Sequence, residues 1–262
     1  MCELYGMSSS MPAQIYISLC EFRRHGGDTG DHVDGWGLAY IDGNKPDIYR
    51  EAGPAAQSLK MDDVLQQHKP TKMLISHIRK ATQGDVSLRN TQPYTMEFAG
   101  RTHIFVHNGN LLDLPINLPL NQFKPEGETD SEYAFCYLME QLVPLWQEST
   151  PSLNKRLPVI ESTFKILTHM GIGNFLYSDG EYLYAFGNER TQEDGIVSPP
   201  GLYYLVRDWD NDQDYNTITG ITIKGQSQKQ IIVASVPLTK EDWQPLAKNQ
   251  LLVAKDGLLV HR

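Results

Sequence analysis

The chain opens with Met1-Cys2-Glu3-Leu4-Tyr5-Gly6-Met7, and this stretch decides the interpretation of the fold. Residues 2–6 predict a short strand. The small side chain of Cys2 permits removal of Met1, which would leave a thiol and a free α-amine on one residue. An α-amine has an unperturbed pKa of about 7.7 to 8.0, so it can take the thiol proton and later return it to a leaving amine. Position alone favours a small buried residue of the first strand.

The composition favours one large domain and argues against polyanionic partners. With 262 residues and 40% hydrophobic content, the chain can bury a large core, and we expect residues 1–262 to form a single domain. The net charge of −9 should repel phosphate backbones and anionic lipid headgroups. We therefore expect no nucleic-acid partner and no membrane partner.

The cysteines and the N-terminus indicate a cytoplasmic protein. Three cysteines, Cys2, Cys20 and Cys136, make an odd number without C-x-x-C spacing, which argues against a disulfide framework and against a thiolate metal site. No basic segment followed by an apolar run starts the chain, and no apolar run approaches the roughly 20 residues of a spanning helix.

The first half of the chain predicts alternating helices and hairpins. Ser10-Met11-Pro12 predicts a helix start, with Ile15, Leu19 and Phe22 on one face. The Gly- and Asp-rich residues 26–34 predict a loop. A hairpin follows, with strands at 37–41 and 47–50 and an Asp-Gly turn at 42–43. The next predicted elements are a helix near 59–68, a strand at 72–79, a long polar loop at 84–93 and a strand at 102–107.

The second half repeats this mixture. The strand at 102–107 is expected to stop at Asn108-Gly109, and Thr129 with Glu132 has the spacing of a helix capping box. The remaining predicted elements are a helix at about 159–170, a hairpin turning at 179–180 and strands near 202–206 and 230–235. The pattern indicates a mixed α+β class with prominent antiparallel hairpins.

Three clusters besides Cys2 carry residue types suited to chemistry. Arg79 ends a strand, and its planar fork suits a carboxylate better than a lysine would, although a surface ion pair is an equal alternative. Asn108-Gly109 offers a side-chain amide beside an unhindered N–H, which suits an oxyanion hole, but the same pair is a common hairpin turn. Asp130 stands at the first helical position, where it can hold an ammonium group or serve only the helix end.

Seven motifs in chain order make the sequence resemble the class II glutamine amidotransferases, which are N-terminal nucleophile (Ntn) hydrolases. Within this family, the sequence most resembles the stand-alone YafJ-like members. The motifs are M-C-E-L-Y-G-M (1–7), G-G-D-T-G-D-H-V-D-G-W-G (26–37), S-H-I-R-K-A-T (76–82), N-T-Q-P-Y (90–94), H-N-G-N-L (107–111), G-E-T-D-S-E (127–132) and L-Y-S-D-G (176–180). The resemblance implies a four-layer αββα sandwich.

The resemblance also implies residue roles. Cys2 would be the nucleophile and, through its α-amine, the base, and Asn108 with Gly109 would form the oxyanion hole. Arg79, helped by Thr82, would bind the α-carboxylate of glutamine, and Asp130 would bind its α-ammonium. The implied reaction is hydrolysis of the γ-glutamyl amide through a Cys2 thioester, with no cofactor and no metal.

Two positions depart from the pattern of relatives. Gln92 stands where many relatives have His, and Lys80 follows Arg79 where some synthase-attached relatives have an aromatic residue. Neither is a catalytic position in the family, so the departures bear on loop packing and on the leaving-group side.

Other functions compete with this interpretation. A metal hydrolase could use His103 and His107, which share a strand face, with His25, His32 and His77 elsewhere in the chain. No H-E-x-x-H or Asp-rich cluster accompanies them. A noncatalytic regulatory protein on the same fold would be favoured if Met1 stayed on. Within the enzyme class the leaving group is open: ammonia could pass to a separate synthase chain, or the substrate could be a γ-glutamyl peptide of thiol metabolism.

Overall fold

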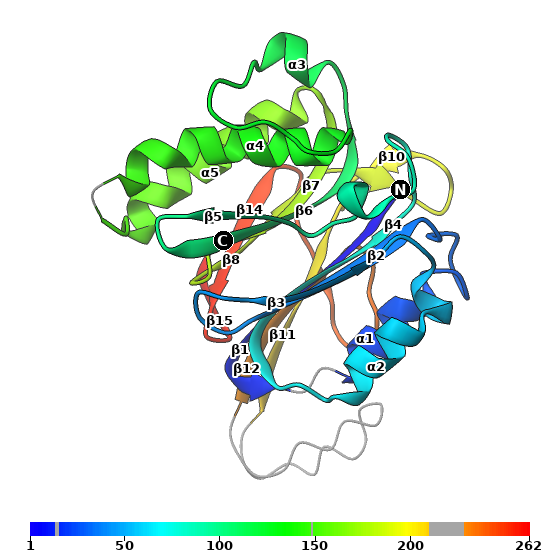
Figure 1. The fold of residues 1–262 in the computed structure, drawn as a ribbon. Coiled ribbons are helices and arrows are strands. Elements are labelled where there is room, and N and C mark those ends of the chain that lie inside the picture. The colour runs from blue at the N-terminus through cyan, green and yellow to red at the C-terminus, as the bar shows by residue number, and fades with distance from the viewer. Residues whose placement is uncertain (14–15, 148, 210–227) are drawn as a thin grey trace.

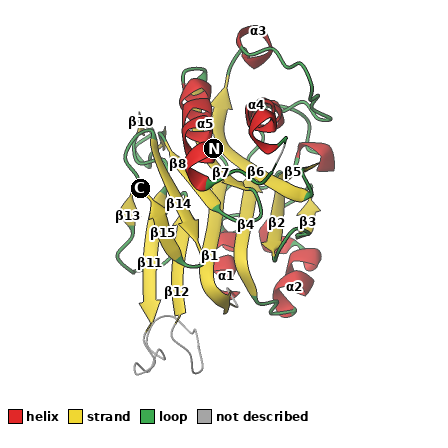
Figure 2. Cartoon of the chain, turned by 90° about the vertical axis from the view of Figure 1, so that its left-hand side faces the viewer, coloured by secondary structure: helices red, strands yellow, loops and turns green. Residues whose placement is uncertain are grey.

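The computed structural model describes residues 1–13, 16–147, 149–209 and 228–262 (Figure 1). Two antiparallel sheets lie face to face at its centre, and helices cover both outer faces (Figures 1 and 2).

The first sheet has seven strands in the order β13-β11-β12-β1-β4-β2-β3. Its central strand is β1, which pairs antiparallel with β4 through Glu3 and Ile78 and with β12 through Tyr5 and Ala234. The bounds are β1 Glu3–Ala13, β2 Gly35–Ile41, β3 Asp47–Glu51, β4 Thr71–Arg79, β11 Tyr203–Trp209, β12 Gln228–Ala234 and β13 Gln244–Pro245.

The second sheet has six strands in the order β15-β14-β8-β7-β6-β5. Its bounds are β5 Tyr94–Phe98, β6 Arg101–Leu111, β7 Gly171–Ser178, β8 Leu183–Gly187, β14 Gln250–Lys255 and β15 Leu258–His261. A short separate hairpin joins β9 (Arg190–Thr191) and β10 (Val197–Ser198).

The helices form the two outer layers. The first sheet is covered by α1 (Tyr16–Arg24) and α2 (Leu59–Gln66), and the second by α4 (Asp130–Leu142) and α5 (Leu153–Thr168) (Figure 1). Shorter helices are α3 (Leu114–Asn117), η1 (Ala55–Gln57), η2 (Leu88–Asn90) and η3 (Val143–Trp146).

Three apolar clusters hold the layers together and confirm the four-layer αββα sandwich. One packs α1 and α2 on the first sheet, one packs α4 and α5 on the second, and the third lies between the sheets. Side chains alternate along a strand. Tyr5 and Met7 of β1 therefore enter the helix-side cluster, while Leu4 enters the cluster between the sheets.

The predicted helix start at residue 10 is wrong. β1 continues to Ala13, and the described part of α1 begins at Tyr16; Ile15, predicted on its apolar face, lies outside the described residues. The three serines at positions 8–10 resemble a helix cap in sequence. In the structure, Ser9 and Ser10 instead bond to Gln228 and Lys229 of β12, which lie far along the chain.

Two further boundaries differ from the predictions. β6 does not stop at Asn108-Gly109 but runs to Leu111, because residues 104–111 pair continuously with β7. α5 begins at Leu153 rather than Val159, with Pro158 inside it. Proline disfavours a helix interior, but apolar contacts of Leu153 and Leu157 with the core extend this helix ahead of it. The strands β5, β14 and β15 had no counterpart among the predicted elements.

Candidate active site

The Cys2 thiol lies at the entrance to β1, against the end of β4. Its Sγ accepts from the Lys80 backbone N–H and donates to the Lys80 carbonyl, each at 3.4 Å. Burial raises the pKa of this thiol, while the hydrogen bond from Lys80 and the positive charges of the chain's amino group and Arg79 act in the opposite direction. A thiol in this setting needs a base before it can act as a nucleophile.

Arg79, the last residue of β4, is buried and holds the loop that follows it. Its Nη2 donates to the carbonyls of Gln83 (2.9 Å) and Gly84 (3.3 Å), and its Nη1 donates to that of Asp85 (2.8 Å). A guanidinium has five N–H donors, so these bonds leave two for other partners. Thr82 lies exposed on the same loop.

Asn108 and Gly109 lie inside β6, in register with Asn174 and Gly173 of β7. The alternative that this pair forms a hairpin turn is therefore wrong. Only glycine fits at position 109, because a Cβ there would lie 1.9 Å from the carbonyl oxygen of Ile172 and 2.6 Å from Nε2 of His107.

The Asn108 side chain connects the second sheet to the first. Its Nδ2 lies 3.3 Å from Oγ of Ser235, which also accepts from the Leu4 backbone N–H at 2.9 Å. The other amide atom, Oδ1, is buried and without a hydrogen-bond partner among the described residues. Amide oxygen and nitrogen exchange places on a half-turn. A half-turn would let the Ser235 hydroxyl donate to Oδ1 and leave the two Nδ2 donors in the unpartnered position.

Asp130 begins α4 and faces a small cavity. Its Oδ2 accepts from the Leu111 backbone N–H at 2.7 Å, and the residue lines a cavity of about 300 Å³ together with Gln83 and Tyr133. Thr129 caps the helix by accepting from the Glu132 backbone N–H at 3.2 Å. The Glu132 carboxylate, expected to complete the capping box, instead accepts from the backbone N–H groups of residues 126 and 127.

A continuous set of contacts links these residues. Cys2 contacts Lys80, Arg79 next to it bonds to Gln83, and Gln83 Nε2 donates to Oδ1 of Asn110 at 2.7 Å, one residue before Leu111, which bonds to Asp130. The charges of Arg79 and Asp130 also act on the Cys2 thiol. A thiol, a cation and a carboxylate from three distant parts of the sequence thus share one region.

Two residues of this region were not assigned to it from the sequence. Gln83 lines the small cavity beside Asp130. His32, considered only as a possible metal ligand, is buried, and its Nε2 lies 2.6 Å from the Met1 carbonyl oxygen. One signal for each residue was present in the sequence. Gln83 directly follows the motif at 76–82, and His32 lies inside the motif at 26–37, but neither was expected to act on a substrate.

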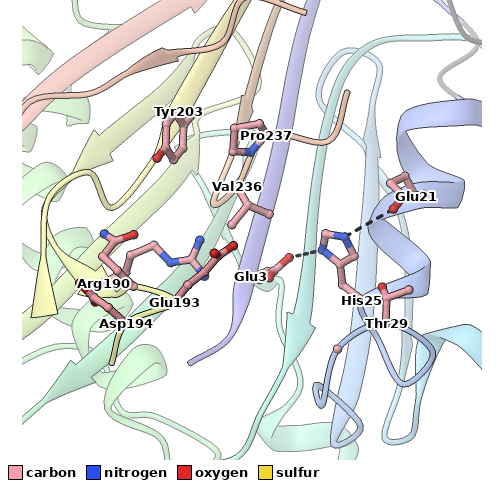
Figure 3. Close-up of a pocket in the computed structure, with 12 residues that line it drawn as sticks. Glu3, Glu21, His25, Thr29, Arg190, Glu193, Asp194, Tyr203, Val236 and Pro237 are labelled. Atoms are coloured by element: carbon pink, nitrogen blue, oxygen red, sulfur yellow. Dashed lines mark hydrogen bonds and ion pairs between the residues drawn. The ribbon is translucent and has the colours of Figure 1, made fainter. Parts of the chain in front are cut away.

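A larger cavity of about 750 Å³ borders Glu3, the residue after Cys2 (Figure 3). Glu3 lines it and pairs with Nδ1 of His25 at 2.7 Å, and the two lie between Arg190 on one wall and Glu21 on the other (Figure 3). The hydrogen bond that His25 donates to the Glu3 carboxylate raises the pKa of His25. The lining carries both signs of charge, with carboxylates in excess.

The two histidines of β6 that were considered as metal ligands, His103 and His107, have other partners. His103 Nδ1 bonds to the Tyr177 hydroxyl at 2.6 Å, and His107 Nδ1 bonds to the Ser131 hydroxyl at 2.9 Å. No group of three or more His, Cys, Asp or Glu side chains suited to a metal occurs among the described residues. Within the same residues, no helix is long and apolar enough to cross a membrane.

Comparison with known sequences identifies similar proteins along the whole chain. The family described as class-II glutamine amidotransferases matches residues 1–262. A Haemophilus influenzae protein is 34% identical over 258 residues, covering 98% of this chain and 85% of its own. The YafJ protein of Escherichia coli is 33% identical over 249 residues, 94% of each chain. Both are named glutamine amidotransferases only provisionally.

Solved structures agree on the fold. A Pseudomonas aeruginosa protein described as a predicted glutamine amidotransferase superposes with a TM-score of 0.69 at 24% identity, covering each chain completely. The glutamine phosphoribosylpyrophosphate amidotransferase of Bacillus subtilis gives a TM-score of 0.61 at 16% identity, over 98% of this chain and 48% of its own.

Proposed function

Because the chain belongs to the class II glutamine amidotransferases, we propose that it cleaves the γ-glutamyl amide of glutamine through a thioester on Cys2, releasing ammonia and glutamate. The observation that carries this proposal is the series of contacts that begins between the Cys2 thiol and Lys80 and continues from the adjacent Arg79, through Gln83 and Leu111, to Asp130. It supplies a nucleophile, a cation and a carboxylate within one region.

The proposed chemistry begins after removal of Met1. The α-amine of Cys2 accepts the thiol proton, and Sγ attacks the side-chain carbonyl carbon of glutamine, whose oxygen becomes an oxyanion. Collapse of this intermediate breaks the C–N bond, and the ammonium of Cys2 returns the proton to the departing ammonia. Water, deprotonated by the same amine, then hydrolyses the thioester to glutamate and the free thiol.

In this proposal Asn108 and Gly109 stabilise the oxyanion, consistent with the unpartnered end of the Asn108 amide. Asp130 holds the α-ammonium from the wall of the small cavity. Arg79 acts in two ways, because it fixes the loop that carries Thr82 and also offers its positive charge, with its remaining donors, to the α-carboxylate.

A second candidate is hydrolysis of a γ-glutamyl compound with a leaving group larger than ammonia. The cavity of about 750 Å³ beside Glu3 favours it, because ammonia needs no such space and Glu3 directly follows Cys2 in the chain. In the first candidate, the ammonia either leaves as product or passes to a separate synthase chain. We also propose a cytoplasmic location, in keeping with the need for a reduced thiol.

The decisive experiment compares Cys2→Ser with Cys136→Ser. Cys136 is buried in α4, where burial raises its pKa to about 12, so its replacement should leave hydrolysis near the wild-type rate. Cys2→Ser should abolish turnover of glutamine and of γ-glutamyl peptides, and a diazo-ketone analogue of glutamine should label Cys2 alone. Intact-mass measurement should show the loss of one Met from the active protein. Full activity with Met1 retained, or labelling of Cys136, would overturn the mechanism.

A further inference from the structure

His32 is in contact with the residue that must leave before the proposed chemistry can start. Its Nε2 lies 2.6 Å from the Met1 carbonyl oxygen, and its Nδ1 lies 3.1 Å from the backbone carbonyl oxygen of His25. A carbonyl oxygen only accepts hydrogen bonds. Each contact therefore needs an N–H on that ring nitrogen, and Nε2 is released from this requirement once the Met1 carbonyl has gone.

Removal of Met1 changes what His32 faces. The Cys2 nitrogen is joined to the Met1 carbonyl oxygen through one carbon, by bonds of about 1.2 and 1.3 Å, so it lies within about 5 Å of Nε2. That is the reach of a direct bond after a small shift, or of a bond through one water. The loss of the Met1 carbonyl leaves the new α-amine as the nearest partner for Nε2.

We infer that His32 is a positioning residue for the N-terminal amine: its neutral imidazole donates from Nδ1 to the His25 carbonyl and accepts an N–H of the Cys2 amine at Nε2. This bond turns the amine so that its lone pair can face Sγ. The inference rests on the proposed function and adds to it a group that holds the base in place.

The surroundings of His32 fit this role. The side chain is buried, and Nδ1 lies close to Gly30, where an added Cβ would approach it to 3.0 Å. Charged and titratable groups facing it are Glu3 on β1, Asp31 in its own loop and His77 on β4. Glu3 pairs with His25, and Asp31 pairs with Lys80. Burial keeps His77 neutral by lowering its pKa far below the usual value.

The inference predicts a graded loss when His32 is replaced. His32→Gln retains a hydrogen-bond acceptor for the amine, whereas His32→Ala does not. His32→Ala should lower kcat by about tenfold to a hundredfold with little change in the KM of glutamine, and His32→Gln should recover part of that loss.

The experiment measures kcat and the KM of glutamine for wild type, His32→Ala, His32→Gln and the control His169→Gln. His169 is exposed at the C-terminal end of α5. Intact mass must show that each variant starts at Cys2; otherwise Cys2 is exposed by a site-specific protease. Wild-type kinetics in His32→Ala, or no recovery of kcat in His32→Gln, would overturn the inference. If Cys2→Ser still turned over glutamine, the proposed function would fail instead.

Discussion

Arg79 acts on the proposed substrate and on its own loop through the same guanidinium. Three of its N–H donors hold the carbonyls of residues 83–85, and a lysine ammonium cannot reproduce this planar fork. We expect Arg79→Lys to lower kcat/KM about tenfold or more for glutamine and for γ-glutamyl peptides alike, since each charge-assisted bond contributes about 1.5 to 3 kcal/mol. Asp130→Asn should also lower kcat/KM for both substrates. Steady-state kinetics on both substrates provide the check, and a loss confined to one of them would contradict a headgroup role.

Asn108 should behave differently, because an oxyanion donor acts mainly on the tetrahedral intermediate. We expect Asn108→Ala to lower kcat by roughly a hundredfold or more with KM little changed. The amide also spans from β6 to Ser235, so circular dichroism of the variant must first show an intact fold. A raised KM with an unchanged kcat would instead assign Asn108 to ground-state binding.

At the scale of elements, Ser235 joins three strands around the proposed site. It directly follows β12, its backbone N–H donates to the Leu4 carbonyl of β1 at 3.0 Å, and its hydroxyl accepts from the Leu4 N–H at 2.9 Å. Ser235→Ala leaves that buried N–H without its acceptor, which should cost about 1 to 3 kcal/mol in the free energy of unfolding. Denaturant titration measures this loss, and the exposed Ser162→Ala serves as control. A loss no greater than that of the control would show that the hydroxyl is dispensable.

Elements specified by local pattern were predictable, and those specified by distant partners were not. The hairpin of β2 and β3, the turn at 179–180 and the Thr129 cap of α4 follow from alternation, Asp-Gly turns and capping chemistry within a few residues. The extension of β1 past Gly6 depends on β12, and the passage of β6 through Asn108-Gly109 depends on β7. Neither partner is visible in the local sequence.

The same division holds for the candidate site. The residue types at positions 2, 79, 108 and 130 were identified from motifs, and the structure brings the charges of Arg79 and Asp130 close enough to act on the Cys2 thiol. The contact of His32 with the Met1 carbonyl was not predictable, because it requires the loop at residues 25–34 to fold back over the N-terminus. The bonds from the Arg79 guanidinium to the carbonyls of residues 83–85 were not predictable either, because they depend on how that loop folds back on the strand.

At the scale of the whole molecule, buried neutral histidines should make the fold sensitive to acid. Burial lowers the pKa of His103 to about 4 and also lowers the pKa values of His77 and His107. Such residues bind a proton more readily in the unfolded chain, where the pKa is near 6.5. Their contribution to stability is therefore complete above about pH 6.5 and is lost as the pH falls toward 4.

His103 provides the test of this acid sensitivity. A shift from 6.5 to about 4 corresponds to about 3 kcal/mol of unfolding free energy lost across that interval. His103→Phe retains an aromatic ring beside Tyr177 and Trp146 but cannot titrate. The substitution removes the hydrogen bond to the Tyr177 hydroxyl, so the variant should be less stable than wild type near neutral pH. Its unfolding free energy, measured by denaturant titration from pH 7 to pH 4, should nevertheless fall less steeply than that of wild type. The exposed His169→Gln should follow the wild-type curve, and a His103→Phe curve parallel to both would show that His103 does not contribute to the acid sensitivity.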